Sequence, residues 1–270
     1  PHGGSDAAAG PFAGLAAALS SRHPWLTFVV DGPGPWVGLD VDVVPWQEAL
    51  VRQNQRWYPG ADAPQVAAAF VLQYLLQVPA HTLAYAVALT LPGRAGDSRG
   101  RGPGATSLTS DPANGHLGRF RHLSIDAETF RNDGPAWTPD PARLTFRLGA
   151  HHVPETIQLP ADLGSWRPLT GPEAKSRGTS TTETTTAEAW EAAERDYRAV
   201  AEPLATAYEA IVHLGSGTRL GMVTDLWRQA VHAATGQPSI VQRDSCCFLY
   251  ALPGCHECAG CPRLRTAPQR

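Results

Sequence analysis

All five cysteines of this 270-residue chain lie between residues 246 and 261, and the first 245 residues contain none. They are Cys246, Cys247, Cys255, Cys258 and Cys261. Thiolates bind metals and thiols pair as disulfides, so a group this dense indicates one shared task. The candidate chemistries are a disulfide framework, a zinc site and an iron–sulfur cluster.

A disulfide framework suits this set poorly. An odd number of cysteines leaves one thiol over, and disulfides persist mainly in oxidising compartments. Residues 1–10 are small and polar, without the charged and apolar regions of a signal peptide. We therefore expect a cytoplasmic protein whose cysteines bind metal.

Zinc is the simplest metal to consider. Cys258 and Cys261 have the spacing of a zinc knuckle, and His256 or Cys255 could add a ligand. Structural zinc sites usually combine two spaced pairs, whereas the other pair in this chain is vicinal. Adjacent residues rarely direct both side chains at one small tetrahedral ion, so zinc stays an alternative.

An iron–sulfur cluster accommodates adjacent cysteines better. A [2Fe–2S] cluster has two irons that each take two thiolates, so Cys246 and Cys247 could reach different irons. With Cys258 and Cys261 they form the motif Cys-Cys-x10-Cys-x2-Cys, and Cys255 is spare. A [4Fe–4S] cluster is the competing form, because Cys-x2-Cys-x2-Cys-Pro copies part of the bacterial ferredoxin run. The fourth cysteine of that run is missing.

The residues around this motif carry a family resemblance. Arg243 and Ser245 precede it as Arg-x-Ser, a proline follows it, and the pair Leu226-Trp227 stands about twenty residues upstream. In these features residues 196–264 resemble the ferric-siderophore reductase family typified by FhuF. The N-terminal two-thirds of the chain is similar to that family only in length and helix-rich character.

The resemblance implies a cofactor, a reaction and partners. In the family four cysteines bind a [2Fe–2S] cluster, and these ligands carry over to Cys246, Cys247, Cys258 and Cys261. The implied function is that of a ferric-siderophore reductase: one electron passes from the cluster to siderophore-bound Fe(III), and Fe(II) is released for iron assimilation. The implied partners are the ferric siderophore and an external electron donor, a ferredoxin or a flavoprotein. The alternatives are an iron–sulfur electron carrier or redox sensor, and a zinc-knuckle interaction module.

Residues near the cysteines supply further candidates, although no catalytic side chain beyond the cluster is expected. Hydrogen bonds to the sulfurs tune a cluster, and the residues expected to lie close enough are Arg243, Ser245, Tyr250 and His256. From residue 219 onward, six arginines face three acids in a chain of formal charge −3. Arg263 and Arg265 could therefore steer an anionic siderophore, and a solvated tail is the alternative.

The composition and the absence of certain sequence motifs argue against other classes of function. The net charge of −3 does not suit a nucleic-acid-binding chain. Lys175 is the only lysine and follows Ala174, so the chain has no P-loop. Gly215 and Gly217 complete neither a nucleophile elbow nor a dinucleotide-binding loop. Without a flavin, nicotinamide or nucleotide site, the electrons must come from another molecule.

Periodicity predicts an α+β fold whose N-terminal part mixes a small antiparallel sheet with buried helices. Strands are expected at residues 25–30, 36–41, 117–126, 144–148 and 156–159. The apolar run 63–92 should form two buried core helices that meet at Pro79, each too short to cross a bilayer. We expect no transmembrane segment, and a peripheral position at the cytoplasmic membrane face stays open.

The domain division follows composition. We expect a siderophore-reductase-like α+β domain over residues 1–167, a polar linker over 168–186 and a helical domain over 187–270 that contains the iron–sulfur segment 243–264. One helix should start after a capping box at Thr185 and end at Gly215. The next should run over 218–235 with Leu220, Val223, Trp227 and Val231 inward. The loop 93–104 is either a solvated insertion or a basic lid over an anionic ligand.

Overall fold

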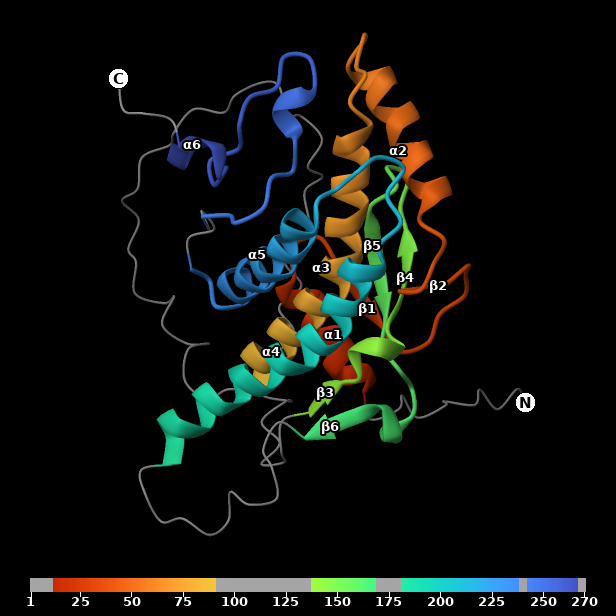
Figure 1. The fold of residues 1–270 in the computed structure, drawn as a ribbon. Helices are drawn as coiled ribbons and strands as arrows, with labels where there is room; N and C mark the ends of the chain where they lie inside the picture. The colour runs from red at the N-terminus through yellow and green to blue at the C-terminus, as the bar shows by residue number, and fades with distance from the viewer. Residues whose placement is uncertain (1–11, 91–136, 169–180, 238–241, 267–270) are drawn as a thin grey trace, which may run out of the picture.

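The computed structural model describes residues 12–90, 137–168, 181–237 and 242–266. The helices are α1 (Ala13–Arg22), α2 (Val44–Trp57), α3 (Pro64–Thr90), α4 (Thr181–Ala207), α5 (Ser216–Ala234) and α6 (Arg263–Thr266) (Figure 1). The strands are β1 (Thr27–Val29), β2 (Val37–Gly38), β3 (Trp137–Pro139), β4 (Thr145–Leu148), β5 (Pro154–Gln158) and β6 (Trp166–Pro168). The predicted α+β class is confirmed.

The described strands form two small sheets. β3 and β6 form an antiparallel pair, and the larger sheet has the order β1-β5-β4-β2. In the larger sheet β1 runs parallel to β5, whereas the other pairs are antiparallel. Phe146 and Ile157 are cross-strand partners and both are fully buried, so this face of the sheet covers the core. The strand expected at 117–126 and the loop 93–104 lie outside the described residues.

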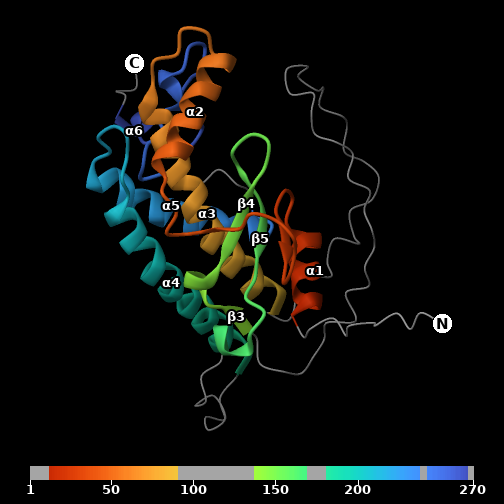
Figure 2. The same ribbon diagram turned by 90° about the vertical axis from the view of Figure 1, so that its right-hand side faces the viewer.

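Helix α3 is the central element of the fold. It lies between the larger sheet on one side and α4 with α5 on the other (Figures 1 and 2). The prediction of two helices that meet at Pro79 is wrong, because α3 continues through this proline. Proline removes one helix hydrogen bond, but neighbours pack around α3 and hold it, and Thr82 Oγ1 donates to the Val78 carbonyl at 2.7 Å.

The same helix has the length and hydropathy of a membrane span. Within the described part of the chain, residues Pro64–Leu89 are the one segment with this property, and 83% of the apolar window is buried inside the protein. Its apolar side chains are therefore occupied by contacts with the sheet and the other helices.

Helix α4 differs at both ends from the prediction. It starts at Thr181, before the capping box expected at Thr185, and ends at Ala207, well before Gly215. Tyr208 explains the early end: its side chain is buried and its hydroxyl donates to the Ala68 carbonyl of α3 at 2.7 Å. The chain leaves the helix to make this contact, and Gly215 instead precedes α5 as its N-cap.

Two large apolar side chains are exposed, and one of them, Leu220, was expected to face inward. Trp57, the last residue of α2, is 55% exposed and rests on the His151 ring with centroids 5.5 Å apart. Leu220 is 44% exposed, because α5 turns Gly221 and Asp225 toward the cysteine segment instead. Val223 and Trp227 are buried as predicted.

Buried residues from both predicted domains contribute to one hydrophobic core. Leu72 and Leu76 of α3 belong to the same cluster as Tyr197 of α4 and Leu226 of α5. The helices that carry the cysteine segment therefore rest directly on the N-terminal part. The boundary at 168–186 itself stays a prediction, and residues 169–180 lie outside the described part.

Candidate metal centre

The cysteine segment, residues 242–264, lies at one end of the molecule beyond α5 (Figure 1). On one side it contacts α5, where a Cβ on Gly221 would stand 3.3 Å from Ser245 Cβ. On the other side Phe248, Leu249 and Leu252 pack on the turn between α2 and α3, around Val66. Two independent parts of the fold therefore hold the segment.

Asp225 anchors the start of this segment. Its side chain is fully buried on α5. The Asp244 amide donates to Oδ1 at 2.7 Å, and the Ser245 amide and hydroxyl donate to Oδ2 at 2.8 and 2.5 Å. Arg243 Nε lies 3.7 Å from the same Oδ2. One carboxylate thus orients the three residues that precede the vicinal cysteines.

Gly260 joins the two halves of the motif. Its carbonyl accepts a hydrogen bond from the Arg243 amide at 2.9 Å and from Gln242 Nε2 at 3.3 Å. The Cys261 amide in turn donates to the Cys258 carbonyl at 2.9 Å, which closes the knuckle between them. These bonds bring the late pair of cysteines beside the vicinal pair.

Side-chain interactions link four of the thiols. The Cys246 side chain interacts with Cys261 and with its neighbour Cys247, and burial together with these contacts raises the pKa of the Cys246 thiol. The Cys258 side chain interacts with Cys247 and Cys261, and burial followed by these contacts raises the pKa of the Cys258 thiol as well. Side-chain hydrogen bonds pair Cys246 with Cys261 and Cys258 with Cys247, so the vicinal cysteines have different partners.

Cys255 interacts with a residue outside the cysteine segment. Its thiol interacts with the Tyr58 side chain at the end of α2, and burial followed by this contact raises the pKa of the tyrosine. It packs with the small cluster around Leu252. The turn at Gly254, with φ at 77°, leads the chain into this position.

A backbone amide also faces one of the sulfurs. The Phe248 amide lies 3.4 Å from Cys246 Sγ, and Phe248 is in the left-handed region with φ at 59°. A left-handed conformation is uncommon for a residue other than glycine. In this conformation the chain turns back over the vicinal cysteines. Amide donors of this kind stabilise metal-bound thiolates.

The other predicted site residues fall into different places. Arg243 and Ser245 are buried at the Asp225 anchor. Tyr250 is half-buried and lies under the Arg263 guanidinium, 4.0 Å from the ring centre. His256 is exposed. The backbone of Arg265 belongs to α6, and its side chain lies outside the described atoms.

The arginines of the segment have acidic neighbours. Arg228 pairs with Asp244 at 2.9 Å, and Arg263 pairs with Glu257 at 3.6 Å. Arg243 faces Asp225, as described above. The positive charge available to a ligand is therefore smaller than the count of arginines suggests.

Sequence analysis missed two residues that shape the site, Asp225 and Tyr58. The role of Asp225 could have been inferred from its position. It stands between Val223 and Leu226 on the inward face of α5, where a buried acid needs hydrogen-bond donors. The role of Tyr58 had no signal, because its contact with Cys255 spans almost 200 residues of sequence.

Four thiols form the donor set of the candidate centre. Among the described residues, no group of three or more His, Cys, Asp or Glu side chains converges as one metal ion requires. The four thiols instead approach in two pairs. A [2Fe–2S] cluster takes two cysteines at each of two irons, so it would need four thiols in all.

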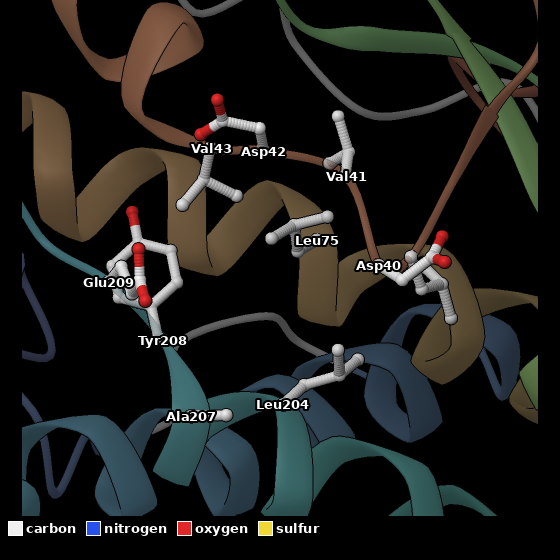
Figure 3. Close-up of a pocket in the computed structure, with 10 residues that line it drawn as sticks. Asp40, Val41, Asp42, Val43, Leu75, Leu204, Ala207, Tyr208 and Glu209 are labelled. Atoms are coloured by element: carbon white, nitrogen blue, oxygen red, sulfur yellow. The ribbon is translucent and has the colours of Figure 1, made fainter.

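A cavity of about 340 Å³ opens elsewhere, between the loop before α2, the middle of α3 and the end of α4 (Figure 3). Its floor includes Leu75 and Leu204, and three carboxylates line it, those of Asp40, Asp42 and Glu209. None of the five cysteines lines this cavity. It is a separate feature of the surface.

Comparisons with protein families, curated proteins and solved structures found no match to this chain.

Proposed function

We propose that this protein is a ferric-siderophore reductase in which Cys246, Cys247, Cys258 and Cys261 hold a [2Fe–2S] cluster. The observation that supports the cofactor is the meeting of these four thiols in two pairs, with Cys255 excluded. When bound, such a cluster supplies one-electron transfer. The choice of a siderophore substrate comes from the resemblance of the motif and its surroundings.

The chain divides the thiols between two positions. Cys246 with Cys261 and Cys247 with Cys258 are the ligand pairs that the contacts favour. Each pair contains one buried cysteine, since Cys247 is 5% and Cys261 is 2% exposed. The other member of each pair is half-buried. The protein thus shields one side of the site from water and leaves the other open to a partner.

The proposed substrate chemistry needs little from side chains. Hydroxamate and catecholate oxygens are hard donors and hold Fe(III) much better than Fe(II). One electron converts the bound Fe(III) to Fe(II), and the weakened complex then releases the metal. The electron comes from an external donor, a ferredoxin or a flavoprotein. No proton transfer or nucleophile is required, so the task of the chain is to bind and to bring the partners close.

One observation favours a second candidate, an iron–sulfur electron carrier or redox sensor. The cavity of about 340 Å³ is lined by residues of other elements, not by the cysteine segment. An electron carrier needs an accessible cluster edge but no substrate pocket beside the cluster. The zinc-knuckle module is less well supported, because the vicinal cysteines contact different partners.

Anaerobic rapid mixing separates these functions. Chemically reduced protein is mixed with a ferric hydroxamate siderophore in the presence of a ferrous chelator. A reductase should regain its oxidised visible spectrum while the ferrous chelate develops, and NADPH alone should leave the oxidised protein unchanged. Reoxidation no faster than in buffer would favour the carrier or sensor. A colourless protein that contains zinc would favour the interaction module.

A further inference from the structure

Asp225 and Arg243 form a buried charge pair at the start of the cysteine segment. Asp225 is fully buried, and Arg243, three residues before Cys246, is 8% exposed. Their closest charged atoms, Oδ2 and Nε, are 3.7 Å apart. Charged side chains are rarely buried unless partners compensate for the lost hydration. In this protein several of the partners belong to the cysteine segment itself.

The pair constrains where the segment can lie. Both oxygens of Asp225 accept hydrogen bonds, Oδ1 from the Asp244 amide and Oδ2 from the amide and hydroxyl of Ser245. Bonds to two successive amides define the direction in which the chain enters Cys246. The Arg243 amide continues the connection to the Gly260 carbonyl, next to Cys261. Both halves of the motif are thereby placed relative to one carboxylate.

The pair also places two opposite charges beside the sulfurs. Arg243 stands three residues before Cys246, and its amide bonds at 2.9 Å to the carbonyl of Gly260, the residue next to Cys261. Charges act strongly where water is excluded. An added electron makes a metal–thiolate centre more negative, so a nearby cation favours reduction and a nearby anion opposes it.

We propose that Asp225 is the positioning residue of the cysteine segment, and that the buried Asp225–Arg243 pair sets the reduction potential of the centre held by the four cysteines. Asp225 orients residues 243–245 and lowers the potential, whereas Arg243 raises it. The redox half of this inference rests on the proposed function. The positioning half concerns the chain with or without metal.

Potentiometric titration of the full chain, followed by its visible spectrum, tests the redox half. Asp225→Asn should make the potential more positive and Arg243→Gln more negative, each by about tenfold in the one-electron equilibrium, or about 59 mV. Asp244→Asn is the matched control, because this exposed acid of the same segment is paired with Arg228 and screened by solvent. Its shift should be much smaller.

Potential shifts of opposite sign in Asp225→Asn and Arg243→Gln would distinguish an effect of charge from an effect of a loosened cysteine segment. A segment that is only loosened would shift both buried variants in the same direction, and such a result would overturn the redox half. An equal shift in Asp244→Asn would do the same. If Asp225→Asn does not fold, Arg243→Gln leaves the carboxylate in place, and an unchanged potential in that variant overturns the redox half.

Hydrogen exchange of the metal-free protein tests the positioning half. The amides of Asp244 and Ser245 should exchange at least about tenfold faster in Asp225→Asn, because asparagine offers one acceptor oxygen to three donors. Ser245→Ala keeps both amide bonds and should retain the protection. Unchanged exchange in Asp225→Asn, or loss of protection in Ser245→Ala, would overturn the positioning role. A chain that binds no iron would overturn the redox half and the proposed function together, while this measurement still decides the positioning half.

Discussion

The thiol of Cys255 forms a hydrogen bond with the side chain of Tyr58, whereas Cys246 and Cys258 interact with Cys247 and Cys261. Tyr58 follows α2, on the opposite side of the cysteine segment from α5. A [4Fe–4S] cluster held by the ferredoxin-like run would use Cys255 as a ligand, whereas a [2Fe–2S] cluster held by the other four cysteines would not. This difference sets the first prediction.

Replacement of Cys255 should leave the centre intact. We expect Cys255→Ser to keep the iron content and the visible spectrum, since serine retains a hydroxyl beside Tyr58. Cys258→Ser is the matched comparison: it changes the same atom three residues later and should bleach or strongly alter the protein. Loss of colour in Cys255→Ser would mean that the ligand set is wrong.

Metal analysis should give a two-iron cluster. Freshly purified protein should contain equal amounts of iron and acid-labile sulfide, about two of each per chain, as this cluster type requires. Chelation or oxidation that removes the metal should also expose free thiols to a thiol reagent. Zinc without sulfide would refute the proposed cofactor.

The close approach of α5 to the cysteine segment makes Gly221 sensitive to substitution. A Cβ at this position would stand 3.3 Å from Ser245 Cβ and 3.4 Å from the Asp244 carbonyl carbon. We expect Gly221→Ala to speed the loss of the cluster and to reduce stability by roughly 1–3 kcal/mol through overpacking.

Gly217→Ala is the control for this prediction. It lies on the same helix, but a Cβ there meets nothing within 4 Å. Alanine should raise the stability of the helix by up to about 1 kcal/mol and leave cluster release unchanged. Equal release rates in the two variants would show that the segment does not rest on Gly221.

A buried histidine pair predicts a loss of stability in acid. His23 Nε2 lies 2.8 Å from His81 Nδ1, and the Leu26 amide donates to His23 Nδ1 at 2.9 Å. Burial, and then the charge of His81, lowers the pKa of His23 to about 3. Burial lowers the pKa of His81 to about 4. Both rings thus stay neutral in the folded protein while the unfolded chain takes up protons below its pKa of 6.5.

The stability that depends on these neutral rings is fully present above pH 6.5 and is lost as the pH falls toward 4. At pH 5 one such histidine costs about 2 kcal/mol relative to neutral pH. Denaturant unfolding at pH 7.5 and pH 5 should show this loss, and His81→Gln should reduce it. The exposed His151 is the control, since His151→Gln should leave the difference between the two pH values unchanged. The same pH difference in His81→Gln and the wild type would refute the prediction.

The acidic partner of Arg263 allows a test of electrostatic steering. Arg263 pairs with Glu257 and covers the Tyr250 ring. If an anionic siderophore approaches this edge, Arg263→Glu should slow the reaction severalfold at low salt, and Glu257→Gln should speed it. Both differences should shrink at high salt, because the ions screen exposed charges. Equal rates in the wild type and both variants would indicate that this C-terminal region is a solvated tail and does not steer the substrate.

The features that could be predicted from the sequence are local ones. The cysteine spacing singled out four thiols and a spare, and this ligand set stays a prediction. Periodicity located strands β4 and β5 to within a few residues. These features are set by neighbours along the chain, through side-chain alternation, turn residues and metal-ligand spacing.

Other features depend on contacts between distant segments and could not be inferred from spacing. Helix α3 continues through Pro79 because the surrounding sheet and helices hold it, and α4 ends early because Tyr208 bonds to Ala68. The role of Asp225 depends on amides of residues 244 and 245, which reach it only after α5 and the cysteine segment have folded together. Sequence alone thus determined which residues could form a metal centre. Tertiary structure decided which buried charges and which neighbours surround it, because burial and electrostatic contact depend on distance in space, not on separation along the chain.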